Sequence, residues 1–394
     1  MAAALHAARS GHQRYRMGRR GSRMGVSPAS GAGFNDRAER FGRIHAGRPT
    51  PPFVRNLATE PTLLRHGGLT FPCTINHAEP DNAWVCSPVA TYGSYVIEEI
   101  GRTVPPPFAW PLQALCRGYR GVLSLARADQ AVAINNWMLS TNLYPAFEPA
   151  RDADALAGIV DEALRRWPGH AIWFRSLNAR HDGAWIAALR GLGFDLLPSR
   201  QVYLFDDLPR ARHANLRRDL KLLGGTPLAA RVSADFGPAD FARAEALYGC
   251  LYLDKYSRLN PHYTAAFMER WHAAGLLDFW GLCDGGVLQA VVGTFRQGGT
   301  ITAPIVGYDT ALPQALGLYR LLMAHVLDTA RRDGLQVNLS AGAARFKRLR
   351  GGRPALEYSA VLSRHLPAPR RAALRALRGM AEGIGVPMMR RLEL

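Results

Sequence analysis

Two different periods of hydrophobic and polar positions follow one another in the last third of the chain. Ile301–Val306 is apolar and rich in β-branched residues, and a turn follows it, so the pattern predicts a strand. Leu318–Arg332 carries apolar residues at helical spacing and stops at two arginines and Gly334, as helices commonly do. Leu335–Leu339 predicts a second short strand. A strand, a helix and a strand in this order form a βαβ unit, whose two strands lie parallel.

The same patterns predict the other elements of the chain. Before residue 208, they predict strands at Leu69–Ile75, Ala83–Cys86, Val122–Ala126, Gln130–Ile134, His170–Phe174 and Gln201–Phe205, and helices at Thr91–Ile100, Pro111–Cys116, Asp152–Trp167 and Gly183–Leu192. After residue 208, they predict helices at His213–Leu223, Pro238–Leu251, Tyr263–Ala274 and Arg370–Met380, and strands at Leu228–Val232, Leu277–Cys283, Val287–Arg296 and Gly299–Val306. Helices and central strands therefore recur in a similar order in two parts of the chain.

The length of 394 residues favours two domains. We predict a disordered basic N-terminal segment over residues 1–52, an N-terminal half over 68–207, a linker helix within 208–227, a C-terminal half over 228–366 and a basic C-terminal helix or tail over 367–394. Disorder is predicted at the start because the first fifty residues contain ten arginines and little apolar periodicity.

Composition and charge narrow the classes of function. No apolar run approaches the roughly 20 residues that a membrane span needs, so we expect no integral membrane segment and a cytoplasmic protein. Five cysteines lack CxxC spacing, and we expect neither a disulfide framework nor a metal. The net charge of +18 favours anionic partners such as CoA, RNA or an anionic membrane surface, although arginine is also simply common in some GC-rich genomes. Gly-x-Ser-x-Gly, Walker and His-Glu-x-x-His motifs do not occur, which disfavours covalent and metal catalysis.

The start of the predicted helix at Leu318 is the first candidate binding site. The first amides of a helix are unpaired and carry partial positive charge, so they suit phosphates. Gln314, Gly317 and Tyr319 form a Gln-x-x-Gly-x-Tyr pattern there. This pattern resembles the Gln/Arg-x-x-Gly-x-Gly/Ala loop with which GNAT acyltransferases hold the pyrophosphate of acyl-CoA. Tyr319 stands where that loop has a small residue, and an ordinary loop before a core helix is the alternative interpretation.

A longer stretch carries a more specific resemblance. Its motifs are Gly307-Tyr308-Asp309, then Ser340-Ala341-Gly342, then Phe346-Lys347-x-x-x-Gly351. Together with the helix between them, they resemble the last part of the GNAT_6 or BioF2-like acyltransferase domain, which is related to the Fem-type aminoacyltransferases. The resemblance runs from about residue 248 to 365 and is mostly architectural from about 68 to 207. It implies an α/β (α+β) tandem GNAT-like fold, with two mixed sheets flanked by helices.

The resemblance also implies roles for particular residues. Lys347 is a candidate for stabilising an oxyanion or a diphosphate, Tyr308 for donating a proton and Asp309 for accepting one. Gln314, Gly317 and Tyr319 are candidates for holding acyl-CoA, such as acetyl-CoA, as co-substrate. The candidates for binding the acceptor are Tyr256, Asn260, Ser340 and Arg348. A surface lysine, a turn aspartate and a solvated arginine face remain open as alternatives.

Three functions fit these observations. The first is an acyltransferase that moves an acyl group from acyl-CoA to an amine, either a small molecule or an acceptor like a cell-wall precursor. The second is a Fem-type aminoacyltransferase whose donor is aminoacyl-tRNA, which would make tRNA a partner. The third is a catalytically inactive GNAT-fold module that binds an anionic ligand or RNA. For the first, we expect a change of Lys347 to Ala to abolish transfer with a nearly unchanged melting temperature.

Overall fold

The computed structural model describes residues 31–208 and 213–392. The first part of the chain contains α1 (Gly31–His45), β1 (Glu60–His66), β2 (Leu69–His77), η1 (Ala90–Ser94), α2 (Tyr95–Thr103), α3 (Pro106–Leu125), β3 (Gln130–Ile134), α4 (Pro149–Arg166), β4 (Ala171–Asn178), α5 (Gly183–Gly191) and β5 (Asp195–Phe205). The second part contains α6 (Ala214–Gly224), β6 (Ala229–Arg231), η2 (Ser233–Asp235), α7 (Pro238–Tyr248), η3 (Gly249–Asp254), α8 (Ala265–Ala273), β7 (Asp278–Asp284), β8 (Val287–Gln297), β9 (Thr300–Tyr308), η4 (Gln314–Leu316), α9 (Leu318–Asp333), β10 (Gln336–Asn338), α10 (Ala344–Arg348) and β11 (Arg353–Leu362). The chain then continues through α11 (Ala368–Met380), η5 (Ala381–Gly385) and α12 (Val386–Leu392).

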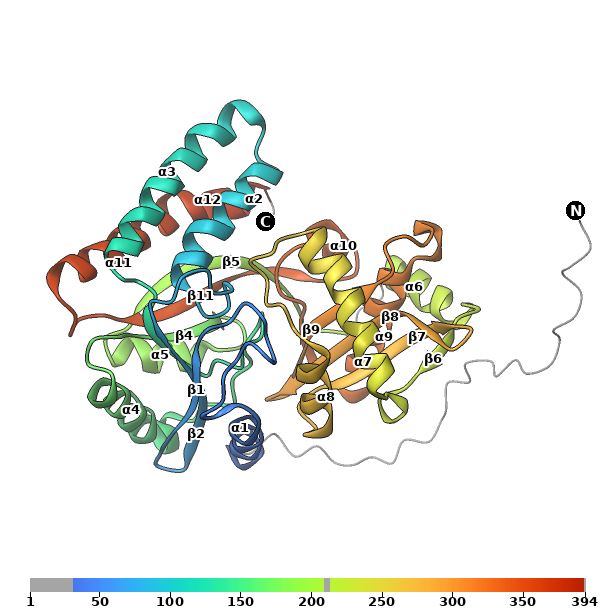
Figure 1. The fold of residues 1–394 in the computed structure, drawn as a ribbon, viewed down its shortest axis with the longest axis horizontal. Helices are drawn as coiled ribbons and strands as arrows, with labels where there is room; N and C mark the ends of the chain where they lie inside the picture. Colours follow the sequence, from blue (N-terminus) through green and yellow to red (C-terminus); the bar gives the residue numbers. More distant parts are fainter. Residues whose placement is uncertain (1–30, 209–212, 393–394) are drawn as a thin grey trace, which may run out of the picture.

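One mixed sheet of eleven strands runs through both parts, in the order β1-β2-β3-β4-β11-β5-β10-β9-β8-β7-β6, and helices flank it (Figure 1). The predicted α/β class is confirmed, and the two sheets expected from the sequence are joined edge to edge. The predicted βαβ unit is also confirmed, because β9 and β10 pair in parallel with α9 as the crossover. A second unit of the same kind consists of β3, α4 and β4.

The sheet is joined by a strand that returns from the end of the chain. β11 lies between β4 and β5 and is antiparallel to both. β5 in turn pairs with β10 at Leu204–Asn338 and Phe205–Val337. Residues 353–362 therefore complete the sheet of the first part, although the predicted boundaries assign them to the C-terminal half. A boundary at residue 208 does not separate two independent sheets.

The prediction of disorder is wrong for residues 31–52, whereas residues 1–30 lie outside the described part of the chain. α1 is amphipathic, and its Phe34 and Phe41 are fully buried with ring centroids 5.7 Å from that of Trp137. His45 at its end is 1% exposed and accepts a hydrogen bond of 2.8 Å from Trp271 Nε1. The missed signal was the seven-residue spacing of the two phenylalanines among arginines, which puts both on one helix face.

Two of the predicted strands are also wrong. Val122–Ala126 is the end of α3, a helix that begins at a proline-rich turn where proline fits the first helical positions. Ala83–Cys86 is buried but irregular. Its amides bond outside any ladder, Ala83 to Asn56 O at 2.9 Å and Trp84 to Leu259 O at 3.1 Å. In both places, an apolar run was too short for its period to decide between helix, strand and buried loop.

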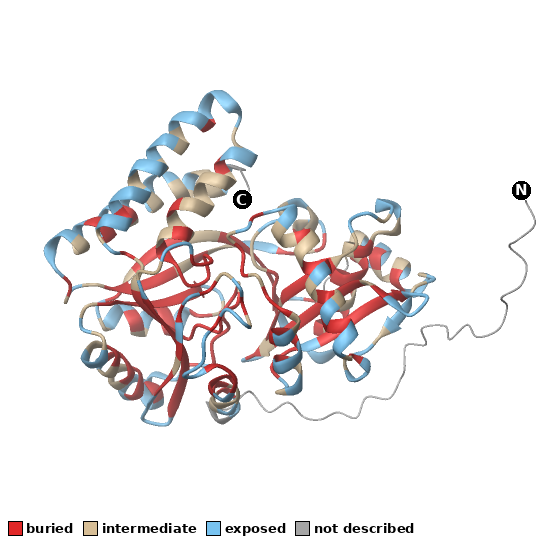
Figure 2. Ribbon diagram, viewed as in Figure 1, coloured by how far each residue is buried: buried red, intermediate tan, exposed pale blue. Residues whose placement is uncertain are grey.

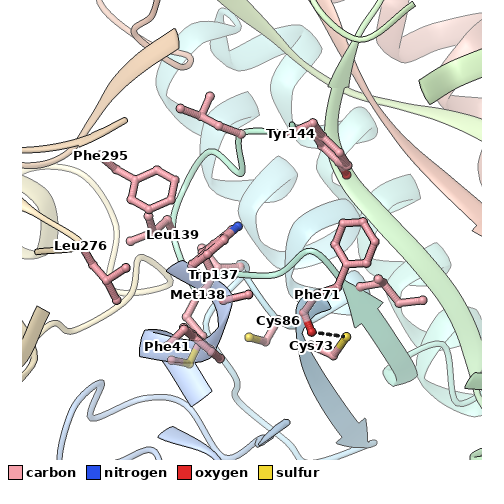
Figure 3. Packing of buried hydrophobic residues seen from close by; sticks show 14 of the residues in the cluster. Phe41, Phe71, Cys73, Cys86, Trp137, Met138, Leu139, Tyr144, Leu276 and Phe295 are labelled. Atoms are coloured by element: carbon pink, nitrogen blue, oxygen red, sulfur yellow. Dashed lines mark hydrogen bonds between the residues drawn. The ribbon is translucent and has the colours of Figure 1, made fainter. Parts of the chain in front are cut away.

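The hydrophobic core is shared between the two parts. Its largest cluster joins residues of α1, β2 and α4 to residues of α7, α8 and β8. Trp137 lies at the centre of the close view, between Phe41 and Phe295, and the Phe295 ring centroid is 5.1 Å away (Figure 3). A second cluster packs α9 against the strands of its own βαβ unit.

Candidate functional site

The two strands of the second βαβ unit diverge soon after they meet. β10 pairs with β9 only at Gln336–Thr300 and Val337–Ile301. β9 continues to its end beside β8, whereas the chain after β10 turns to β5, where Leu339 N donates to Tyr203 O at 3.1 Å. The parallel pair is therefore open beyond Ile301. α9 begins at this same edge, because it follows the carboxyl end of β9.

The start of α9 has the features of an anion site. Gly317 precedes the helix with φ +65° and ψ +33°, a left-handed conformation that suits glycine. No side chain of the described residues caps this end. The first helical hydrogen bond is from Leu321 N to Gly317 O at 3.0 Å, so the amides of residues 318–320 precede it. Gln314 lies exposed in the 3₁₀ turn just before.

Tyr319, which departs from the small residue of the GNAT loop, turns its ring toward other aromatic residues. Its ring centroid lies 4.9 Å from that of Phe346 and 6.4 Å from that of Tyr308. Burial raises the pKa of its phenol, so the side chain is neutral. The ring packs beside the second core cluster, and this packing accounts for a large residue at that position.

Lys347 is a buried residue, which excludes the alternative of a surface lysine. The side chain is 3% exposed, and Nζ donates to Leu339 O and Ala341 O at 2.7 Å and to Ser340 O at 3.2 Å. Burial, with a smaller contribution from the charge of Arg200, lowers the pKa of Lys347 to about 7. Three carbonyl acceptors favour the ammonium form and hold the turn after β10 in place. The expectation of an unchanged melting temperature without this lysine therefore conflicts with its contacts.

Tyr308 and Asp309 lie next to each other at the end of β9, but their side chains have different surroundings. Tyr308 is half-buried beside Tyr319. Asp309 accepts a hydrogen bond of 3.0 Å from Ala311 N and pairs with Arg243 Nη2 at 2.8 Å. These two contacts, the amide first, lower the pKa of Asp309, which makes it a weaker base. The ordinary turn role accounts for Asp309, and its predicted role as a base gains no support.

A buried carboxylate holds the surroundings of the α9 start together. Asp219 on α6 is 1% exposed and pairs with Arg320 of α9, whose Nε lies 2.8 Å away. It also pairs with Arg350, which follows α10. The sequence did not reveal this triad because Asp219 precedes Arg320 by 101 residues and Arg350 by 131, and none of the three forms a motif. Ser340 and Arg348, two predicted acceptor-binding residues, are half-buried; Ser340 O accepts from Lys347 Nζ, and Arg348 follows Lys347 in α10.

The two remaining predicted acceptor residues differ from each other. Tyr256 is 44% exposed, and its ring centroid lies 6.0 Å from that of Tyr252. Asn260 is 6% exposed, its Oδ1 accepts from Trp84 Nε1 at 3.0 Å, and its Nδ2 donates to Tyr252 O at 3.0 Å. Both ends of the Asn260 amide are used inside the protein, so binding an acceptor through this amide would require one of these hydrogen bonds to break.

In the first βαβ unit, the corresponding opening is filled by the chain itself. β3 and β4 pair from Ala131–Ala171 to Ile134–Phe174, and β4 then continues to Asn178. The segment after β3 folds back onto this free length, where Asn142 N donates to Ser176 Oγ at 3.0 Å and Tyr144 Oη donates to Arg175 O at 2.5 Å. Figure 3 shows Trp137, Met138 and Leu139 of this segment packed among buried hydrophobic residues. The chain itself therefore occupies the free edge of β4 beyond Phe174.

The start of α4 is likewise occupied by the chain. Asp152 is 5% exposed, and its Oδ2 accepts a hydrogen bond of 2.9 Å from Glu148 N. Its Oδ1 pairs with Arg151 Nε at 2.7 Å, and this bond is the first cause of the lowered pKa of Asp152. An ionised carboxylate in the first turn stabilises the positive end of the helix dipole and repels other anions.

An open hollow between α1 and α8 carries another concentration of positive charge. Its charged lining consists of Arg40, Arg43, Arg48 and Arg270, with Asp36 as the acidic member. Arg40 pairs with Asp36 at 2.6 Å and also donates to Ala274 O at 3.0 Å. Over residues 31–208 and 213–392, no group of three or more His, Cys, Asp and Glu side chains could hold a metal ion. None of the helices described is long and apolar enough to cross a membrane.

Comparisons with known proteins found one family model and several solved structures. Residues 210–348 match the family model described as Acetyltransferase (GNAT) domain. A search of curated protein sequences gave no match. Similar solved structures include the C-terminal domain of a putative lysylphosphatidylglycerol synthetase from Agrobacterium fabrum, at 15% identity over 59% of this chain and 78% of that one, with a TM-score of 0.44. They also include FemX, at 11% identity over 54% and 77%, with a TM-score of 0.41, and a tandem GNAT protein from the clavulanic acid pathway, at 12% identity over 60% and 76%, with a TM-score of 0.35.

Proposed function

We propose that this chain, whose residues 210–348 match a GNAT acetyltransferase domain, transfers an acyl group from acyl-CoA to an amine. The observation that carries the proposal is the start of α9. It has unpaired amides behind a left-handed Gly317, no side-chain cap, and a diverging pair of parallel strands beside it. Amides at the positive end of a 16-residue helix suit the pyrophosphate of CoA. The open strands give the acyl arm a place to lie along the backbone of β9.

The proposed reaction is a direct transfer within one complex. The amine nitrogen attacks the thioester carbonyl, the C–N bond forms, the C–S bond breaks, and the amine proton and the CoA thiolate leave. Tyr308, at the carboxyl end of β9, is the candidate that returns a proton to the thiolate. Lys347 is a positioning residue in this account, because its ammonium is held by the carbonyls of residues 339–341 and thereby fixes the chain that faces β9.

The acceptor would approach from the aromatic side of the opening. Tyr256 is exposed there, and Tyr252 behind it stacks on Tyr248 at 4.9 Å between ring centroids. Arg102 donates to the backbone carbonyl of Tyr256 and so fixes the position of this residue. Rigid aromatic side chains on one wall favour an acceptor with an apolar portion next to its amine. A small molecule and a cell-wall-precursor-like amine both meet this requirement.

An aminoacyl-tRNA donor is the second candidate. The observation that favours it is the hollow lined by Arg40, Arg43, Arg48 and Arg270, because guanidinium groups pair well with the phosphates of a nucleic acid backbone. In that case the aminoacyl ester replaces the thioester, and the same amine attack breaks a C–O bond instead of a C–S bond.

A thermal-shift titration distinguishes the two donors. The full chain is titrated in parallel with acetyl-CoA, a long-chain acyl-CoA, free CoA and bulk aminoacyl-tRNA, since a ligand that binds only the folded state raises the midpoint with its concentration. A shift with acyl-CoA supports the first candidate, and the preferred chain length narrows the acyl group. A shift with tRNA alone favours the second. The absence of any shift would contradict both and favour a module that binds another anion.

A further inference from the structure

One helix exposes an apolar face to solvent along its whole length. At about 100° per residue, a single side of α3 contains Phe108, Trp110, Pro111, Ala114, Leu115, Gly118, Gly121, Val122 and Leu125. All of these residues are exposed, and none carries a charged, hydroxyl or amide side chain. The exposed fractions reach 71% for Phe108, 70% for Trp110 and 88% for Leu125. An exposed apolar surface of this length marks an interaction site.

The opposite side of α3 already has its partners within the protein. Ala109 and Leu123 are buried, Gln113 Nε2 donates to Ile97 O at 3.0 Å, and Tyr119 Oη donates to Ala373 O of α11 at 2.5 Å. α3 extends from the body and contacts α11, and its outer side is shown as exposed in Figure 2. α3 is therefore attached to the protein by its other side, and its apolar face is free within the part of the chain that the structure describes.

The charges around this face indicate what it meets. α3 carries no acidic residue, whereas Arg117 and Arg120 lie on it and Arg127 follows it. Arg102, before α3, is paired with Glu98 and Glu99 and adds no free charge to this rim. α11, which contacts α3, and α12 after it add the exposed Arg375, Arg390 and Arg391. A symmetric contact between two copies would bring these arginines against one another. An anionic surface would be complementary to the same rim.

We propose that α3 docks this protein on an anionic lipid bilayer, with the helix in the plane of the interface and its apolar face among the acyl chains. Phe108 and Trp110 anchor the proline-rich start of the helix, and the arginines of α3, α11 and α12 contact the headgroups. An amphipathic helix with aromatic and aliphatic residues on one side and basic residues around it binds membranes in this manner. The proposal rests on α3 itself and does not depend on the acyltransferase proposal.

Vesicle flotation of the full chain tests the docking. The protein should float with vesicles of phosphatidylcholine and phosphatidylglycerol at low salt, and binding should weaken in vesicles of phosphatidylcholine alone and at high salt. The double change Phe108→Ser with Leu125→Ser should raise the lipid concentration for half-maximal binding by about tenfold or more. The matched control changes Val232 and Val287 to Ser, since both are exposed elsewhere, at 50% and 54%, and should leave binding as it is.

Tryptophan quenching reports which face enters the lipid. Among the eight tryptophans, Trp110 is the only one whose side chain is mostly exposed, since the others are buried or half-buried. Vesicles with brominated acyl chains should therefore quench part of the fluorescence of the native chain and almost none of that of the W110F variant.

Two outcomes would overturn the proposal. One is flotation that is absent, or that is equal in the native chain and the Phe108/Leu125 variant. The other is a dimer in sedimentation velocity that this variant converts to a monomer, because α3 would then be an interface between copies of the chain. Circular dichroism of each variant, compared with the Val232/Val287 control, establishes that a loss of binding is not a loss of folding.

Discussion

The two βαβ units of the protein share a topology and differ in what lies at the start of the crossover helix. In β3–α4–β4, the chain after the first strand fills the opening, and Asp152 places a carboxylate in the first turn of α4. In β9–α9–β10, the strands separate after two residue pairs, and no side chain within residues 31–208 and 213–392 caps α9 at Gly317. The same backbone arrangement thus serves as packing in one unit and as a candidate ligand site in the other.

The difference teaches that the crossover alone does not make a site. The helix dipole is similar at the starts of α4 and α9. At α4 a carboxylate of the protein lies against its positive end, whereas at α9 this end is available to a ligand.

The largest effect is expected from Lys347, which holds the diverging chain of the second unit. Lys347→Met removes the partner of three carbonyl groups in a buried site, and should lower the free energy of unfolding by about 2–4 kcal/mol. It should also reduce acyl transfer, because the residues facing β9 lose their anchor. Urea unfolding and initial rates measure the two effects. Lys221→Met, on the exposed side of α6, is the control and should change stability by less than about 0.5 kcal/mol. A Lys347 variant as stable as this control would show that the carbonyl contacts contribute little.

The second prediction makes the second unit resemble the first. Ala315→Glu puts a carboxylate next to the start of α9, at an exposed position, where it should favour the helix and repel the phosphates of CoA. The KM for acyl-CoA should rise about tenfold, which corresponds to about 1.4 kcal/mol, with an unchanged or slightly higher melting temperature.

Ala315→Gln is the matched control, since it has the same shape without the charge. Equal KM values for the Glu and Gln variants would mean that the phosphates bind away from the start of α9.

The third prediction concerns the carboxylate of the first unit. Asp152→Ala removes the acceptor for Glu148 N and the partner of Arg151, so the free energy of unfolding should fall by about 1–2 kcal/mol. The KM for acyl-CoA should not change, because this helix start has a structural role. If Asp152→Ala changed the KM for acyl-CoA as much as Ala315→Glu does, the donor would bind at the first unit and the assignment to α9 would be wrong.

The smallest expected effect is a dependence of stability on pH that comes from His45 of α1. This helix packs on the first unit, β3–α4–β4. Burial lowers the pKa of His45 to about 3, from an ordinary value near 6.5. Above about pH 6.5 the neutral ring contributes its full stability. Below that pH the unfolded chain binds the proton first, so stability is lost as the pH falls toward 3. The expected loss is about 1 kcal/mol between pH 6.5 and 5.5.

His45→Gln should reduce the slope of this pH dependence by the share of His45, because glutamine can still accept the hydrogen bond from Trp271 Nε1 and does not titrate in this range. Part of the slope should remain, since burial also lowers the pKa of His170 to about 4 and that of His325 to about 3. His66→Gln, at an exposed position of β1, should keep the slope of the native chain. Chemical unfolding at several pH values gives both slopes, and an unchanged slope in the His45 variant would show that α1 does not bury this ring in solution.

The sequence predicted those elements that have a long hydrophobic period or that end at recognisable residues, such as arginines followed by glycine. The second βαβ unit was found because α9 has a basic end and a glycine stop. α1 was missed because two phenylalanines among arginines give a weak period, and its stability comes from Trp137 and Trp271, which are distant in sequence. β11 was missed as part of the first sheet because strand order across such a distance leaves no local pattern.

The candidate site was predictable only in part. The segment from residue 314 to 319 could be located because a helix start and a glycine can be identified in sequence. The burial of Lys347 and the closed amide of Asn260 could not be predicted, since both depend on contacts made by the folded chain. The contrast between the two units was also inaccessible, because the units share no residue pattern.

Isothermal titration of CoA into the full chain tests whether the donor binds at the start of α9. We predict one binding site per chain, a dissociation constant about tenfold higher for Ala315→Glu than for Ala315→Gln, and no change for Asp152→Ala. Two sites per chain, or one site that responds to Asp152 and not to Ala315, would contradict the assignment of donor binding to the start of α9.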